Sequence, residues 1–72
     1  MAFPKYIAWL DGFSVAVGTL AEVERKAREH HATENYQHWQ DGRDSTLRIT
    51  TYGAQKFVKQ VILPAITAEA RP

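Results

Sequence analysis

The chain has 72 residues, no cysteine and a formal net charge of +1. A chain of this length predicts one small domain, and the lack of cysteine excludes a disulfide framework and a thiolate metal site. The near-neutral charge favours no class of partner. The sequence also has no apolar stretch near the roughly 20 residues that cross a bilayer, so we expect no membrane contact. The lack of cysteine suits a reducing compartment, so we expect a cytoplasmic location.

The first predicted element is a hairpin at residues 5–17, where two apolar stretches flank Asp11-Gly12. Asp-Gly between such stretches is a strong hairpin signal, because a type I′ turn needs positive φ at both central residues. A two-residue loop fixes the register, and the predicted pairs on one face are Leu10–Phe13, Ala8–Val15 and Tyr6–Val17. Ile7 and Trp9 then point to the other face. The alternative, a helix over 4–17, would place Gly12 mid-helix at a cost of about 1 kcal/mol.

Residues 19–31 are predicted to form an amphipathic helix. Thr19 and Glu22 make a capping box, in which each side chain bonds to the other residue's backbone N–H. Apolar residues recur on one helix face, which we expect to cover the sheet side chains Tyr6, Leu10, Phe13, Val15 and Val17. The pairs Glu22–Lys26 and Glu24–Arg28 have the i,i+4 spacing of stabilising ion pairs.

The second half of the chain is less regular. Residues 32–45 are polar and contain turn signals, although Thr33 is placed to cap a short helical turn through 34–39. Residues 46–52 alternate as a strand. Residues 54–66 fit either a strand at 56–63, paired with 46–52, or a helix with one apolar stripe. We therefore predict an α+β fold (ββαββ), in which a small antiparallel sheet carries one helix on one face. The domain spans residues 1–66, and a flexible tail spans 67–72.

No catalytic, metal or cofactor site is predicted. The histidines at 30, 31 and 38 lack the spacing and the partners of a metal site. Ser14 has no neighbouring base, and Ser45, Asp41 and Asp44 are explained by turns. The chain is therefore expected not to be an enzyme.

A protein-binding surface is the favoured function. Ile7 and Trp9 lie on the sheet face opposite the predicted helix, where an exposed tryptophan resembles an interface anchor. The predicted partner-binding residues are Ile7, Trp9, Tyr36, Trp39, Arg48 and Tyr52. The alternative is that this face forms a second minor core, in which Tyr36 and Trp39 of the 32–45 loop cover Trp9.

Two rival functions stay open. Arg48, Lys56 and Lys59 could bind nucleic acid together with an aromatic residue. Alternatively, the strand at 56–63 could pair with its copy in a homodimer whose role is assembly.

The strand–turn–strand–helix layout of residues 6–31 is similar to the arm-type DNA-binding domains of phage integrases, although those are more basic on the sheet. The size, charge and single sheet also look like small phage-encoded inhibitors, including anti-CRISPR and RNA-polymerase-blocking proteins. That likeness implies an inhibitor or adaptor that occupies a surface of a larger host machine.

Overall fold

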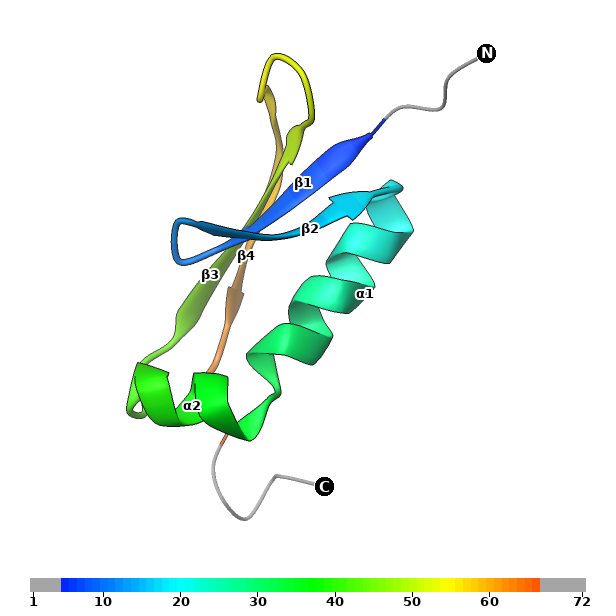
Figure 1. The fold of residues 1–72 in the computed structure, drawn as a ribbon. Helices are drawn as coiled ribbons and strands as arrows, with labels where there is room; N and C mark the ends of the chain where they lie inside the picture. The colour runs from blue at the N-terminus through cyan, green and yellow to red at the C-terminus, as the bar shows by residue number, and fades with distance from the viewer. Residues whose placement is uncertain (1–4, 67–72) are drawn as a thin grey trace.

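The computed structural model describes residues 5–66, which form one antiparallel sheet with two helices (Figure 1). The elements are β1 (Tyr6–Leu10), β2 (Phe13–Gly18), α1 (Leu20–His31), α2 (Glu34–Gln40), β3 (Ser45–Thr51) and β4 (Phe57–Leu63). The strand order is β2-β1-β3-β4. The predicted α+β fold is confirmed, with α2 as an additional short helix, and the open choice for residues 54–66 is settled as a strand. The predicted tail at 67–72 lies outside the described residues.

The β1–β2 turn forms as predicted, but the register beyond it does not. Asp11 and Gly12 both have positive φ, at 50° and 90°, and Leu10 faces Phe13. An irregularity then shifts the pairing, so that Ala8 faces Ala16 and Tyr6 faces Gly18. The predicted pairs Ala8–Val15 and Tyr6–Val17 are therefore wrong.

The register shift between β1 and β2 improves packing of the core and moves Val17 to the other face of the sheet. Because a β-bulge adds a residue to one strand, both Val15 and Ala16 can pack against the core. Val17 consequently faces Ile7 and is 46% exposed, on the sheet side away from α1. It is not under the helix, as the unshifted register predicted.

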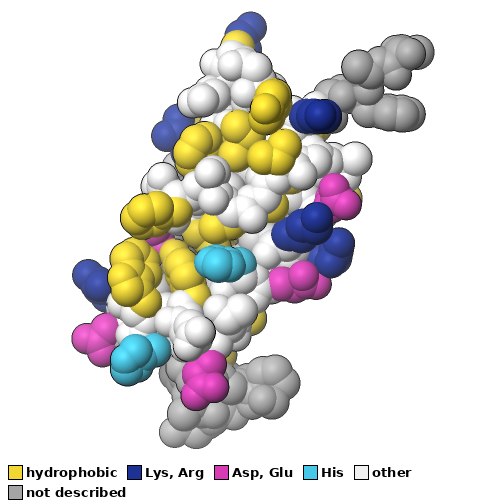
Figure 2. Space-filling view, in the orientation of Figure 1, with side chains coloured by type: hydrophobic (Ala, Val, Ile, Leu, Met, Phe, Trp, Pro, Cys, Tyr) yellow, Lys and Arg dark blue, Asp and Glu magenta, His cyan; other side chains and the backbone are white. Residues whose placement is uncertain are grey.

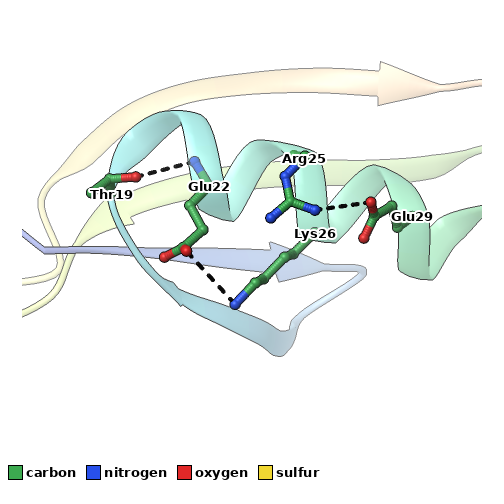
Figure 3. Close-up of polar contacts among 5 residues, drawn as sticks. All are labelled: Thr19, Glu22, Arg25, Lys26 and Glu29. Carbon is green, nitrogen blue, oxygen red and sulfur yellow. Dashed lines mark hydrogen bonds and ion pairs between the residues drawn. The ribbon is translucent and has the colours of Figure 1, made fainter.

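Helix α1 is fixed at its start by Thr19, whose hydroxyl accepts a hydrogen bond from Glu22 N at 3.2 Å (Figure 3). Both predicted ion pairs form on α1. The Glu22 carboxylate lies 4.0 Å from Lys26 Nζ, and the Glu24 carboxylate lies 3.4 Å from a guanidinium nitrogen of Arg28. The reciprocal bond of the capping box, from Thr19 N to Glu22, is absent from the hydrogen bonds among the described residues. The buried face of α1 carries Val23, Ala27 and His31.

The core lies between the helices and one face of the sheet. Its buried members come from five of the six elements, and they are Ala8, Leu10, Val23, Ala27, Tyr36, Leu47, Ile49 and Leu63. Helix α1 packs mainly on β1 and β2. Helix α2 is capped by Thr33, whose hydroxyl accepts from Tyr36 N at 3.3 Å, so the predicted helical turn is confirmed.

Asp11 joins three segments that are distant in sequence. Its Oδ1 accepts from Thr46 N at 2.9 Å, at the start of β3, and its Oδ2 accepts from the Tyr36 hydroxyl of α2. The backbone N–H of Asp11 donates to Thr46 O at 3.0 Å. One turn residue therefore connects the hairpin to the next strand and to α2.

Replacing Asp11 should destabilise the fold strongly. Asp11→Ala removes both side-chain acceptors and places alanine at positive φ, so we expect the free energy of unfolding to fall by about 2–4 kcal/mol. Asp11→Asn keeps an acceptor and tolerates the left-handed conformation, so its loss should be less than half as large. Urea unfolding monitored by circular dichroism measures both. Equal losses in the two variants would show that the side-chain bonds matter little.

His31 connects the end of α1 to α2 and is only 5% exposed. The Gln37 side-chain amide donates to the His31 carbonyl oxygen and lies 3.1 Å from His31 Nε2. Burial lowers the pKa of His31 below the usual 6.5; the Asp11 carboxylate opposes this shift, and the charge of Arg28 adds to it. The folded state therefore holds this imidazole neutral near pH 7.

A lowered histidine pKa makes stability depend on pH. The unfolded state takes up a proton on His31 as the pH falls through about 6.5, whereas the folded state resists it. The stabilisation is thus fully present above that pH and is lost below it, so the free energy of unfolding should fall between about pH 7 and about pH 5. In His31→Gln this slope should be smaller. The matched control is the neighbouring exposed His30→Gln, and identical slopes in wild type and His31→Gln would contradict the prediction.

Candidate functional site

One face of the sheet is left uncovered by both helices, and we call it the open face. Register and alternation assign its side chains, because the other face contributes the core. The open face carries Ile7, Trp9, Ser14, Val17, Thr46, Arg48, Thr50, Phe57, Gln60 and Ile62. It combines aromatic, aliphatic and hydrogen-bonding side chains around one arginine.

Trp9 is held in place on the open face. It lies opposite Arg48 in the sheet, and its Nε1–H donates to the Thr50 hydroxyl at 3.0 Å. Thr50 is itself only 4% exposed, so the acceptor is firmly positioned. The indole is half-buried, with its polar atom already satisfied. A side chain of this kind loses little conformational freedom on binding a partner.

Arg48 lies beside Trp9 and above an aromatic ring. Its guanidinium carbon is 5.7 Å from the centre of the Phe57 ring, within the range of a cation–π contact. Arg48 forms no salt bridge or hydrogen bond with the residues that the structure describes. Its donors are therefore available to an acceptor on a partner.

A hollow of about 580 Å³ runs along the open face. Asp11 and Gly12 of the β1–β2 turn line it, as does Gln55 of the β3–β4 connection. The strands contribute the rest of the lining, which is Trp9, Thr46, Arg48, Thr50 and Gln60. The lining is amphipathic, with one aromatic side chain, one cation, the Asp11 carboxylate and several neutral hydrogen-bonding groups.

Two predicted site residues, Tyr36 and Trp39, lie on the opposite side of the sheet. Tyr36 is in the core, and the Trp39 ring lies 6.0 Å from that of Phe13 in an edge-on arrangement. Figure 2 shows hydrophobic side chains gathered beside a histidine on the helix side of the molecule, and the contacts identify Phe13, His30, Tyr36 and Trp39 as such a cluster. The alternative in which the 32–45 segment covers Trp9 is therefore wrong. The Tyr36 hydroxyl reaches Asp11 from the core side, which directs α2 away from the open face.

The remaining predicted residues are spread over the sheet. Tyr52 follows β3, is 54% exposed, and has Lys5 Nζ 5.8 Å from its ring centre. Lys56 precedes β4 and is exposed. Lys59 lies on the helix side, where its ammonium is 3.1 Å from Glu24 and holds the pKa of that carboxyl below its usual value. The three basic residues of the nucleic-acid hypothesis therefore do not share one surface.

Other candidate chemistry is accounted for locally. Within residues 5–66, no three His, Asp or Glu side chains are grouped closely enough to hold a metal ion. Ser45 is fully buried, and its hydroxyl accepts from Gln40 Nε2 at 2.8 Å, so it serves to anchor α2 to β3. Among the same residues, no helix has the length and apolar character needed to cross a membrane.

The sequence analysis missed Phe57, which is 59% exposed beneath Arg48, and Ile62, which is 54% exposed. Phe57 reaches the open face because the β3–β4 register shifts between Ile49 and Thr50, so that Thr50 faces Phe57 while Ile49 faces Lys59. Simple alternation along β4 puts Phe57 and Lys59 on the same face. Only the register shift places Phe57 and Lys59 on opposite faces, and no turn residue in the sequence marks the position of that shift.

Comparison of the chain with protein families, with curated proteins and with solved structures finds no match.

The Trp9–Thr50 hydrogen bond can be tested by itself. Thr50→Val keeps the shape of the side chain but removes the acceptor, so we expect the free energy of unfolding to fall by about 1 kcal/mol. In a Trp9→Phe background, which has no indole donor, the same substitution should cost clearly less. A double-mutant cycle in urea measures this difference, and additive effects would show that the bond contributes nothing.

Proposed function

We propose that this chain is a non-enzymatic protein-binding module whose open face docks on a partner, with Trp9 as the anchor. The observation that carries the proposal is the fixed indole of Trp9, bonded to Thr50 on a face that neither α1 nor α2 covers. Tryptophan and arginine dominate the binding energy of protein interfaces, and here Trp9 and Arg48 are neighbours. Ile7 lies two positions before Trp9 on the same face of β1, but it is only 7% exposed and so offers a partner little surface of its own.

The open face also favours a chemical type of partner. Arg48 offers a bidentate donor pair to a carboxylate, since it has no acidic partner among the described residues. The hollow beside it pairs the Trp9 ring with neutral hydrogen-bonding groups such as Thr46 and Gln60. We infer a protein surface that presents an apolar side chain next to an Asp or Glu.

The biological role that fits such a module is that of an inhibitor or adaptor occupying a surface of a larger assembly. It acts by surface complementarity, because a net charge of +1 offers no mimicry of nucleic acid. We also place the module in the cytoplasm, because a chain without cysteine gains no disulfides from an oxidising compartment.

Affinity capture from a lysate of the source organism tests the proposal. Arg48→Glu reverses an exposed charge, and Trp9→Ala removes the anchor, so each should reduce the captured partner by about tenfold or more. Lys56→Glu makes the same charge change away from the hollow, and Trp39→Ala removes a ring from the other side of the sheet. Both controls should retain the partner. Quantitative mass spectrometry reads the result, and circular dichroism confirms that each variant is folded.

Two results would contradict the proposal. One is a set of captured proteins that Arg48→Glu and Trp9→Ala leave unchanged. The other is capture of nucleic acid alone, with an affinity that falls steeply as salt rises, which would favour the rival function.

A further inference from the structure

Strand β4 forms one edge of the sheet. It pairs with β3 on one side, and no described element pairs with it on the other. Its residues are mostly apolar, and Ile62 is 54% exposed. Its single charged residue, Lys59, is already bonded to Glu24 of α1. An apolar edge without a free charge is the type of edge that recruits another strand.

The backbone hydrogen bonds of β3 show which backbone groups of β4 face outward. The Thr46 carbonyl oxygen of β3 accepts from Asp11 N, and Tyr52 N, just beyond the strand, donates to Lys5 O. The even-numbered residues of β3 therefore point their backbone N–H and C=O groups toward β1. The odd-numbered residues Leu47 and Ser45 therefore point toward β4, where they face Val61 and Leu63. Alternation leaves the N–H and C=O groups of Gln60 and Ile62 directed to the free edge.

The regular part of this edge is short and clearly bounded. At one end, the register shift between Ile49 and Thr50 interrupts the β4 ladder near Val58. At the other end, Pro64 is the next position that would point outward, and proline has no N–H to donate. Gln60 and Ile62 are thus the two residues able to form a complete ladder.

We propose that β4 pairs antiparallel with β4 of a second copy of this chain, with Val61 facing the partner's Val61 across a two-fold axis. In this register Gln60 faces the partner's Ile62, and the two chains exchange four backbone hydrogen bonds, which use every outward N–H and C=O of the bounded edge. The result is a continuous eight-stranded sheet with both open faces on the same side. This proposal goes beyond the proposed function and does not depend on it.

The side chains make this register the favoured one. Lys59 faces the partner's Leu63, so the two lysines lie far apart and no like charges meet. Moving the axis to Gln60 would leave one complete pair of bonds and oppose Ile62 to the shifted region near the partner's Val58. A register shifted by one residue in either direction would place core-facing side chains of one chain opposite open-face side chains of the other.

Single cysteines test the register directly, because the native sequence contains none. Val61→Cys places the two sulfur atoms across the axis, where Cβ atoms of facing residues lie about 4.5–5.5 Å apart and a disulfide can form after a small adjustment. The matched control is Gln60→Cys, whose two copies would be diagonal at about 7–8 Å. Under mild oxidation, the Val61 variant should become a covalent dimer on a non-reducing gel, and the Gln60 variant should stay monomeric.

Light scattering on the unmodified chain tests the dimer without any substitution. We expect a dimer that dissociates on dilution, and we expect Ile62→Pro, which removes an outward N–H, to be a folded monomer. Ile62→Thr keeps that N–H and should still dimerise. A wild-type chain that stays monomeric at the concentrations used for NMR would overturn the proposal. So would a dimer in which Gln60→Cys cross-links and Val61→Cys does not.

Discussion

The carboxylate of Asp11 is the constraint on which the arrangement of this small protein depends. It accepts from the backbone of β3 at Thr46 and from the hydroxyl of Tyr36, while its own backbone adopts positive φ in the hairpin turn. Burial, followed by the hydrogen bond to Asp11, raises the pKa of Tyr36 to about 12, so the hydroxyl remains a donor at any physiological pH. Asp11 thereby fixes the conformation of the hairpin turn, the position of β3 beside that turn, and the side of the sheet on which α2 lies.

The division between the two faces of the sheet follows from this contact. Because Tyr36 reaches Asp11 from the core side, α2 closes the core and its aromatic neighbours stay on the helix side. The other face is left to Trp9, which is bonded to Thr50, and to Arg48, which makes a cation–π contact with Phe57. The face that the helices leave uncovered thus carries aromatic side chains that are held in place by neighbouring residues.

Features encoded by neighbouring residues were predictable from the sequence. The Asp11-Gly12 turn, the Thr19 cap and the four strands depend on local backbone preference and alternation, and all are found. The placement of Ile7 and Trp9 away from the helix followed from the same alternation. The irregularities near Val15 and Val58 were not predictable, because nothing local marks them and they serve packing against distant elements. The bond from Tyr36 to Asp11 spans 25 positions, which is why α2 was expected on the wrong side of Trp9.

The most direct test of this account is the environment of the Trp9 indole in solution, measured by nuclear Overhauser contacts. The account predicts cross-peaks from the indole N–H of Trp9 to the Thr50 side chain, together with contacts between the ring and the neighbouring Arg48 of β3. It predicts none to the rings of Tyr36 or Trp39. Cross-peaks from Trp9 to either of those rings would show that the 32–45 segment covers the tryptophan, and the open face would then not exist as a binding surface.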